Sequence, residues 1–227
     1  MQGTQAGASP KLAAAFRGLH LAGVASLARN ASRREFARGT SLFHAGDRAT
    51  HIFVIESGSA KIFSATQDGG ERVVAILGPC ELAGELHGPV QSAGARALER
   101  GAALVLPADH VRRCLETAGA AHVITDLLAE QLRRTTATLH GAIGGDSRQR
   151  VAARLCDLAD HQGRRTSAGA TRLGVRLTQE DLGRMTGSSR ETVNKVLALF
   201  AKRGWIETAN GRYSITDEMA LREFAGF

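Results

Sequence analysis

The spacing of hydrophobic and polar positions changes twice along the chain and divides it into three parts. After a short polar stretch, residues 12–32 (LAAAFRGLHLAGVASLARNAS) have the spacing of short helices. From Arg33 the apolar residues stand in short runs rich in β-branched and aromatic side chains, such as HIFVIE, SAKIFSA and RVVAIL. Glycine-containing turn signals separate these runs, and the pattern ends near Pro107. It predicts an antiparallel β-sandwich or barrel.

A helical pattern follows Pro107 and continues to about Ile143. Within it, apolar and small residues repeat at alternating four- and three-residue steps, at Leu128, Leu132, Thr135, Leu139 and Ala142. This heptad seam favours a helix that pairs with a second copy of itself, although a single helix lying on the β region is the alternative. Residues 144–147 (GGDS) break the helix, and we place a domain boundary there.

The last part of the chain begins with an amphipathic helix and a loop. Residues 147–163 place three apolar side chains on one stripe, at Val151, Leu155 and Leu158. Residues 164–177 read as a loop that leads into a short strand.

Two further helices and a hairpin complete the chain. Thr178 has the position of an N-cap for a helix that ends at Gly187, and Ser188 or Ser189 caps the next helix. Residues 205–215 (WIETANGRYSI) have the pattern of a β-hairpin. Helix, glycine turn, helix and hairpin together predict a winged helix-turn-helix.

Composition and charge favour a globular chain with an anionic partner. The 227 residues are 43% hydrophobic but only 4% aromatic, so aliphatic side chains must fill the core. The net charge is +7, and the segment from Ser147 onward contributes +5 of it, with 14 Lys and Arg against 9 Asp and Glu. A basic excess in one part suits nucleic acid, although charge alone does not establish that partner.

Several classes of protein are disfavoured by the sequence. No run of about 18 apolar residues predicts a membrane span, and the N-terminal segment lacks the basic-then-apolar order of a secretory signal. Cys80, Cys114 and Cys156 lie far apart, which favours a reduced cytoplasmic protein without a metal framework. A phosphate loop, a nucleophile elbow and an H-E-x-x-H motif are all absent from the sequence, so we predict that the protein is not an enzyme.

The second helix of the predicted winged domain carries a polar face suited to reading bases. The contacts between its helices are assigned to Leu182, Met185, Val193, Val196, Leu197 and Phe200. This leaves Arg190, Glu191, Asn194 and Lys195 on the outer side, near the helix end that enters a major groove.

The chemistry of this face fits base edges. Arginine and lysine donate to guanine, and glutamate accepts from the amino group of cytosine, so we expect Arg190, Glu191 and Lys195 to read bases. A solvated helix with ordinary charge pairs is the alternative. Four polar residues are expected to bind phosphates, which fix register without carrying sequence information: Thr178, Gln179, Ser189 and Thr192.

These motifs resemble those of a known family. LTQEDLGRMTGSSRETVNKVLALFAKRGWI resembles the DNA-binding module of the cAMP receptor protein/fumarate–nitrate regulator (Crp-Fnr) family. The family's S-R-E-T-V-x-[RK] run is matched from Ser189 to Lys195, where lysine keeps the charge but lacks arginine's bidentate fork. The resemblance implies a transcription regulator that binds double-stranded DNA as a homodimer at a palindromic, TGTGA-like site and works with RNA polymerase.

The resemblance extends to the rest of the chain and implies an α+β fold. LFHAGDRATHIFVIESGSAKIF resembles the family's cyclic-nucleotide-binding antiparallel β-roll, and the helix from about Ala120 to Ile143 resembles its dimerisation helix. We therefore expect a flexible tail over residues 1–15, a sensory β-roll over 16–118, a dimerisation helix over 119–144 and a winged helix-turn-helix over 145–227.

The expected effector pocket departs from the family pattern. GPCELAGEL resembles the start of the family's phosphate-binding cassette, with Gly84 and Glu85 at the ribose-side positions. In the family's cyclic-nucleotide binders the cassette leads to Arg-Ser-Ala, whose arginine pairs with the cyclic phosphate. Here Ser92 and Ala93 match Ser-Ala, so Gln91 stands at the arginine position and offers no positive charge. This disfavours cAMP and cGMP, and no cofactor or metal is assigned.

Other residues bear on the pocket. Thr135 and Thr138 lie where the family places hydroxyls that contact the nucleotide base, although a polar notch in the seam is the alternative. Arg96 follows Gln91 closely, but strand alternation need not aim it at the same spot.

The competing function is an effector-independent DNA-binding or architectural protein with a vestigial β-roll. A haem ligand, among His87, His122 and His140, is a further alternative, although a lone histidine more often packs or lies at the surface.

Overall fold

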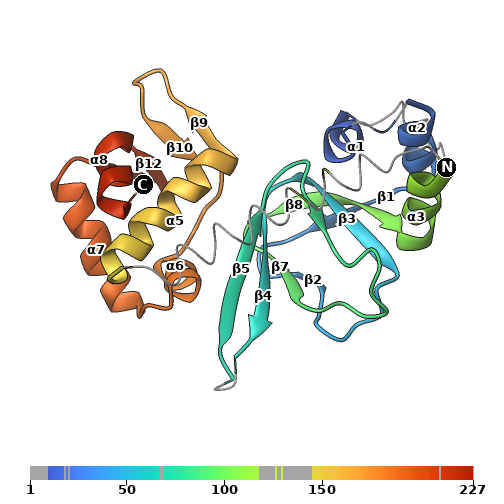
Figure 1. Ribbon diagram of the computed structural model, residues 1–227, viewed down its shortest axis with the longest axis horizontal. Helices are drawn as coiled ribbons and strands as arrows, with labels where there is room; N and C mark the ends of the chain where they lie inside the picture. Colours follow the sequence, from blue (N-terminus) through green and yellow to red (C-terminus); the bar gives the residue numbers. More distant parts are fainter. Residues whose placement is uncertain are drawn as a thin grey trace. The chain divides into compact units, whose positions relative to one another are not determined.

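The computed structural model describes residues 10–17, 19, 21–66, 69–117, 126, 129, 145–209 and 211–226. These residues divide into two units (Figure 1). The first comprises the described residues of 1–64 and 76–132, and the second those of 65–75 and 133–227. Antiparallel strands and helices occur in both units, which confirms the α+β class. None of the described helices is long and apolar enough to cross a membrane.

Two four-stranded sheets form the antiparallel β region predicted from the short apolar runs, arranged as the β-roll that the family resemblance implies. The strands of one sheet are, in spatial order, β1 (Ser32–Phe36), β8 (Gly101–Pro107), β3 (His51–Ser57) and β6 (Leu82–Ala83). Those of the other are β2 (Ser41–Phe43), β7 (Gly94–Ala97), β4 (Ala60–Ala65) and β5 (Glu71–Leu77). One core cluster takes side chains from both sheets, including Phe43, Phe53, Ile55 and Ala95. Alternating positions of the strands therefore face this core.

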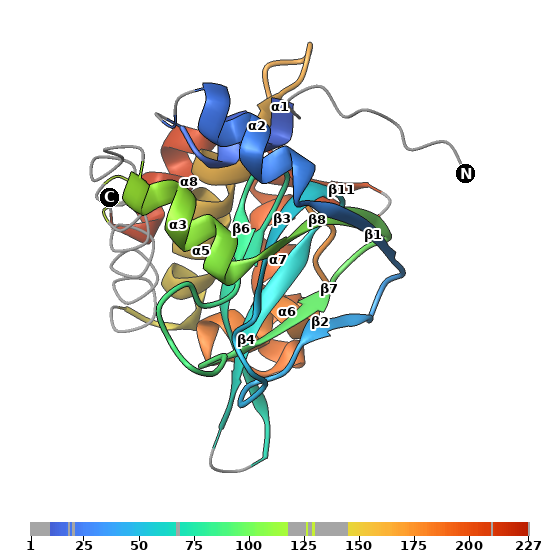
Figure 2. The ribbon, with the colours of Figure 1, turned by 90° about the vertical axis from the view of Figure 1, so that its right-hand side faces the viewer.

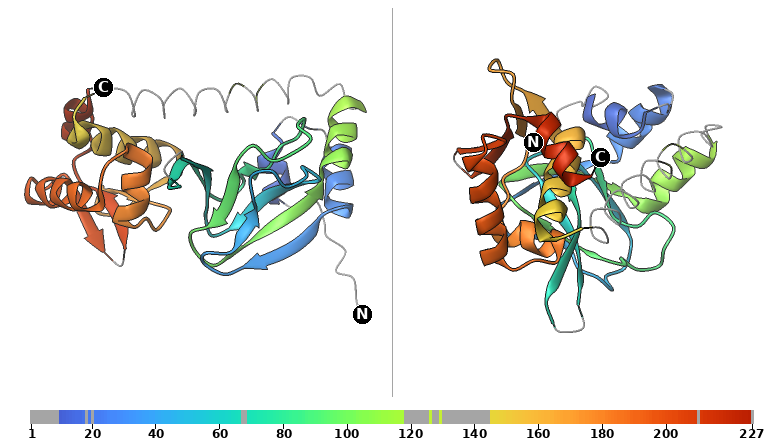
Figure 3. Two further views of the ribbon diagram at one scale, coloured as in Figure 1. Left: turned by 90° about the horizontal axis from the view of Figure 1, so that it is seen from below. Right: turned by 60° about the vertical axis from the view of Figure 1, so that its left-hand side comes forward.

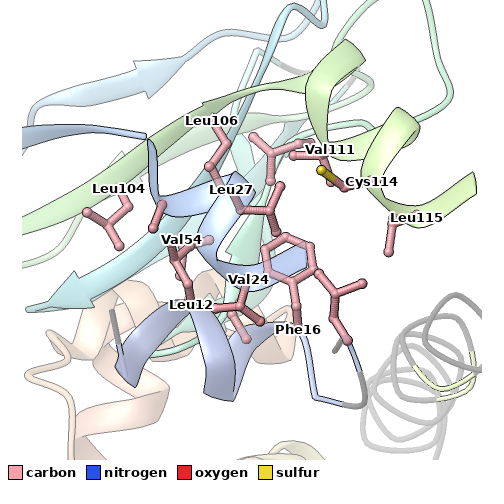
Figure 4. Packing of buried hydrophobic residues seen from close by; sticks show 14 of the residues in the cluster. Leu12, Phe16, Val24, Leu27, Val54, Leu104, Leu106, Val111, Cys114 and Leu115 are labelled. Atoms are coloured by element: carbon pink, nitrogen blue, oxygen red, sulfur yellow. The ribbon is translucent and has the colours of Figure 1, made fainter. Parts of the chain in front are cut away.

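Three helices form a second core against one side of the roll. They are α1 (Pro10–Ala15), α2 (Leu21–Arg29) and α3 (Ala108–Thr117), and they group together in Figure 2. Figure 4 shows Phe16 and Leu27 packed with Leu106 of β8. Leu12 of α1 is fully buried, so the structure differs from the tail expected over residues 1–15: from Pro10 onward, burial of apolar side chains offsets the entropy of ordering the chain.

The predicted dimerisation helix falls almost wholly outside the described residues. Of residues 118–144, only Asp126 and Ala129 are described, and Asp126 is helical. The seam of Leu128, Leu132, Thr135, Leu139 and Ala142 therefore stays a prediction.

The second unit has the helix, turn, helix and hairpin predicted for its end. Its helices are α5 (Ser147–Gln162), α6 (Gln179–Thr186), α7 (Arg190–Lys202) and α8 (Glu218–Ala225). Its strands form one sheet in the order β11 (Ile206–Ala209), β12 (Arg212–Ile215), β10 (Thr171–Leu173) and β9 (Gly163–Arg165). Asp146 caps α5 through a reciprocal capping box with Gln149.

The segment over residues 164–177 differs from the predicted loop and single strand. Its start pairs with its middle to form the β9–β10 hairpin, which is closed by a hydrogen bond from Thr166 N to Ala170 O of 2.8 Å. Gly169 has a φ of +83°, a conformation that glycine adopts at little cost. The sequence GRR of β9 has no alternation of apolar and polar residues, so its pattern could not signal a strand.

Candidate DNA-binding and effector sites

Helix caps hold the two ends of the helix-turn-helix in place. The Thr178 hydroxyl accepts a hydrogen bond from Asp181 N at 3.0 Å, and the Asp181 carboxylate accepts one from Thr178 N at 3.2 Å. Gly187 ends α6 with a left-handed φ of 62°, so the chain turns within a few residues. Ser189, rather than Ser188, then caps α7 by accepting from Thr192 N at 3.1 Å. Both predicted helix starts are confirmed.

Buried apolar side chains lock α7 against its neighbours. Val193, Val196, Leu197 and Phe200 are buried on one side of α7, as expected from the sequence. Leu182 and Met185 of α6 are buried with them. This packing fixes which side of α7 faces solvent, because a helix with one buried stripe exposes the opposite one.

The exposed side of α7 carries Arg190, Glu191, Asn194 and Lys195. Their spacing places them on one face at 3.6 residues per turn. Arg190, Glu191 and Lys195 form no ion pair with any residue that the structure describes. The described residues of this face therefore lack the ordinary charge pairs that the alternative interpretation expected. Two donors and one acceptor remain available to an external partner.

The four residues expected to bind phosphates gather at the starts of α6 and α7. Thr178 and Ser189 are exposed N-caps, and Thr192 and Gln179 are half-buried in the first turns. Helix N-termini favour anions because unpaired N–H groups and the helix dipole both point outward there. This geometry suits the expected contacts, which remain predictions.

A contact between α6 and α7 adds a residue that the sequence analysis left without a role. Gln179 Nε2 donates a hydrogen bond to Asn194 Oδ1 at 3.0 Å. The bond fixes the orientation of the Asn194 amide group and leaves its N–H donors for other partners. The two residues are 15 positions apart and on different helices, so no local pattern could have indicated the pair.

Four of the six expected effector-pocket residues lie together in the β-roll. Gln91 is only 3% exposed, and its Oε1 accepts a hydrogen bond from Glu85 N at 3.0 Å. The Ser92 hydroxyl donates to Glu85 Oε1. Gly84 has a φ of +112°, and a Cβ there would lie 2.9 Å from His51 O. The remaining two, Thr135 and Thr138, lie outside the described residues.

Strand direction turns Arg96 away from this pocket. Ala95 and Ala97 belong to the roll core, so Arg96 between them points to the other face of β7. There its guanidinium stacks on the Phe63 ring at 4.6 Å. Phe63 in turn lies over Gly94, where a Cβ would come within 2.6 Å of the ring. Arg96 therefore does not replace the missing arginine at position 91.

The three cysteines differ in exposure, since Cys80 is half-buried and the other two are buried. Cys114 and Cys156 are buried, and burial raises the pKa of the Cys156 thiol to about 12. Among the residues with described positions, no group of three or more His, Cys, Asp or Glu side chains is placed to hold a metal ion. His87 is exposed, whereas His122 and His140 are not described.

Comparisons with known proteins agree with both halves of this description. Residues 33–118 match the model of the cyclic nucleotide-binding domain, and residues 149–224 match that of the Crp-like helix-turn-helix domain. The chain is 34% identical over 211 residues to the CRP-like cAMP-activated global transcriptional regulator of Mycobacterium tuberculosis, covering 91% of this chain and 93% of that protein. It is 30% identical over 197 residues to the cyclic AMP receptor protein of Thermus thermophilus, and the match covers 85% of this chain and 88% of that protein.

Solved structures show the same fold. A CRP-family transcriptional regulator from Thermus thermophilus superposes with a TM-score of 0.71 at 28% identity, covering 86% of this chain and 97% of that one. FixK2 from Bradyrhizobium japonicum gives a TM-score of 0.76 at 16% identity, and the match covers 86% of this chain and 96% of that one. The chain thus belongs to the Crp-Fnr family of DNA-binding transcription regulators, whose members are not enzymes.

Proposed function

We propose that this regulator binds a palindromic, TGTGA-like site as a homodimer, with one α7 in each half-site. The observation that carries the proposal is the exposed face of α7, on which Arg190, Glu191 and Lys195 have no ion-pair partner in the described structure. Arg190 and Lys195 read guanines, and Glu191 accepts from a cytosine amino group on the opposite strand. A carboxylate in a phosphate-lined groove is repelled unless it makes such a contact.

Selection of binding sites from random DNA tests this assignment. Glu191→Ala should lose its preference at one base pair, because a lost base contact costs about 1–3 kcal/mol. Non-specific binding should stay the same or become stronger, since a negative charge is removed. Glu207→Ala is the matched control: Glu207 is an exposed carboxylate on β11, outside the α7 face. If Glu191→Ala selects the same motif as the wild type, the assignment is wrong.

The homodimer is proposed to form through the seam of Leu128, Leu132, Thr135, Leu139 and Ala142. Two half-sites about one helical turn apart require two linked recognition helices. Leu132→Glu places two like charges in the seam and should give monomers that lose specific DNA binding. If the Leu132→Glu protein sediments as a dimer, the dimer interface lies elsewhere and the proposed seam is wrong. Binding of RNA polymerase and a cytoplasmic location are proposed with this function.

The effector is proposed to differ from conventionally bound cAMP. The two named relatives are a cAMP-activated regulator and a cyclic AMP receptor protein, so cAMP is the reference ligand for the test. A cyclic phosphate carries a full negative charge, which is costly to desolvate unless a cation or several donors replace its hydration. Gly84, Glu85, Gln91 and Ser92 include no cation, and Glu85 adds a carboxylate.

A second candidate, a regulator that binds DNA without any effector, is supported by the Gln91 contact. The carboxamide oxygen of Gln91 already accepts from the Glu85 N–H, so the chain itself satisfies a donor of the cassette. Isothermal titration of the full-length protein with cAMP and cGMP, together with measurements of its DNA affinity with and without each nucleotide, separates the candidates. Low-micromolar binding that tightens DNA affinity would refute both. Tight DNA binding that no nucleotide changes would support the effector-independent regulator.

A further inference from the structure

The segment that forms the expected effector pocket is anchored at its end by backbone hydrogen bonds. We call residues 84–91 the cassette. Gln91 N donates to Asp47 O at 2.8 Å, and Gly46 N donates to Gln91 O at 2.8 Å. Both partners lie in the turn between β2 and β3. The end of the cassette is therefore fixed to the frame of the roll.

A side chain of α3 holds the middle of the cassette. Arg112 Nη1 donates a hydrogen bond to Leu86 O at 2.7 Å, and the same guanidinium pairs with Asp109, one turn earlier on α3. The Leu86 side chain packs against the buried cluster that contains Val111 and Leu115 of α3. A polar and an apolar contact thus bind the same cassette residue to the same helix. We call the hydrogen bond from Arg112 to Leu86 O the latch.

The helix that carries the latch is itself firmly placed. At its start, Ala108 N donates to Thr50 O at 2.9 Å, and Val111 is buried in the core that α3 shares with α1 and α2. His110 Nε2 lies 3.1 Å from Asn30 Nδ2, just beyond the end of α2. Figure 3 shows α3, in light green, next to α2, in blue. Movement of the cassette away from α3 must therefore break the latch, because α3 cannot easily follow.

Other polar groups of the cassette are also paired within the chain. The Glu85 N–H donates to Gln91 Oε1 at 3.0 Å, and the Glu85 carboxylate accepts from the Ser92 hydroxyl. With the latch, an N–H, a carboxylate and a carbonyl of neighbouring residues all have protein partners. Pairing of this kind stabilises one conformation, because each group left unpaired on burial would cost free energy. The chain itself therefore supplies contacts that fix the cassette.

We propose that the latch fixes the cassette on α3 and so maintains a state that binds DNA without an effector. The inference rests on the proposed DNA-binding function and names Arg112 as the positioning residue of its effector-independent form. α3 ends at Thr117, next to the segment predicted to form the dimerisation helix, so the placement of α3 sets where that segment begins. Loss of the latch frees other arrangements, which lowers the fraction of binding-competent molecules and raises the apparent Kd by the same factor.

Hydrogen exchange of the full-length protein, with no nucleotide added, tests the latch directly. Arg112→Ala should speed exchange of the cassette amides, above all the Glu85 N–H, by about tenfold, because a hydrogen bond to a charged group is lost. Exchange in β3 and β8 should not change, since Arg112 lies outside the apolar core. Arg112→Lys should fall between wild type and Arg112→Ala, because an ammonium keeps the charge without the planar fork. Arg113→Ala is the matched control, since it removes the same charge from the next, exposed position of α3.

Fluorescence anisotropy with the palindromic duplex tests the link to DNA binding. Without nucleotide, Arg112→Ala should raise the Kd by about tenfold, in step with the faster exchange. Arg112→Lys should raise it less, and Arg113→Ala should bind like wild type. Asp109→Ala is a second variant in case Arg112→Ala does not fold. It removes the exposed carboxylate that orients the guanidinium, so it should change exchange and Kd in the same direction by smaller factors.

Each contrary result has a definite meaning. Wild-type exchange of the cassette in Arg112→Ala would overturn the proposal, and so would equal acceleration in β3 and β8, which marks general destabilisation. Faster exchange with an unchanged Kd would overturn the link between the latch and DNA binding. Wild-type protein that does not prefer the palindrome over a scrambled duplex would refute the proposed function itself, whereas the exchange result would still decide whether Arg112 holds the cassette.

Discussion

Replacing Gln91 by arginine tests whether one side chain governs the response to cAMP. Gln91 is 3% exposed and accepts one hydrogen bond from the Glu85 backbone, so the wild-type pocket holds a neutral amide. Gln91→Arg puts a cation at this position, beside the Glu85 carboxylate that Ser92 already contacts. Without ligand, the larger and charged side chain should lower the stability of the β-roll by about 1–3 kcal/mol.

Binding of cAMP should recover this stability and more. A guanidinium and a cyclic phosphate form two charge-assisted hydrogen bonds, each with a net value of about 1.5–3 kcal/mol. At the lower limit the pair contributes about 3 kcal/mol, which is more than 100-fold in Kd at about 1.4 kcal/mol per factor of ten. The wild type lacks this contribution because an amide carries no charge and only one N–H₂ group.

Isothermal titration and thermal shift with cAMP measure the gain in the full-length protein. Gln91→Lys is expected to gain less than Gln91→Arg, because an ammonium has no planar fork. Gln91→Ala removes the amide without adding a charge and should gain little. If wild type binds cAMP as tightly as Gln91→Arg, the reasoning about charge is refuted. A gain by Gln91→Ala that equals that of Gln91→Arg would show that space, and not charge, limits binding.

Three further predictions concern the second unit. Ser189→Ala removes the cap of α7 and should lower the free energy of unfolding by about 1 kcal/mol in denaturant titrations, whereas no change would mean that another acceptor satisfies Thr192 N. The Cys156 thiol, with its pKa raised by burial to about 12, favours the folded state up to the unfolded pKa near 9.0, and this preference is lost as pH rises from there towards 12. Alkaline unfolding should therefore begin above about pH 9 and be weaker in Cys156→Ala. Arg172→Thr relieves the charge repulsion with Arg164 and should raise stability by about 0.2–1 kcal/mol, which thermal unfolding of the wild type and variant can resolve.

Most of the fold was predictable from local patterns in the sequence. The caps at Thr178 and Ser189 and the buried stripe of α7 were predictable because each depends on residues within a few positions of one another. The short apolar runs indicated an antiparallel sandwich or barrel for the same reason, since alternation is local to a strand. The helical pattern from Leu12 onward covered most of α1, whereas the assignment of a flexible tail over residues 1–15 missed its start, which burial of Leu12 against β3 and β8 stabilises.

Contacts between elements that lie far apart in the sequence could not be predicted from it. The Gln179–Asn194 hydrogen bond depends on the angle between α6 and α7, and the pairing of Arg164 with Arg172 depends on strand register. The sequence has eight arginines between residues 164 and 212, and Arg164 and Arg172 among them equally fit a solvated loop. Only register and burial place Arg164 and Arg172 on one face of a sheet.

The two sites of this regulator therefore differ in how far family membership determines them. The proposed base-reading face of α7 follows from a contiguous run whose helical spacing is fixed, so Arg190, Glu191 and Lys195 must share a face wherever the run is helical. The proposed effector pocket is assembled from Gly84, Glu85 and Gln91, which a loop brings together, and its charge depends on Gln91, the residue that contacts the Glu85 backbone. On this proposal, a single substitution at Gln91 changes the ligand and leaves the roll intact, because the Gln91 side chain supplies one hydrogen bond and no part of the apolar core. The DNA site can thus persist among relatives that respond to different signals.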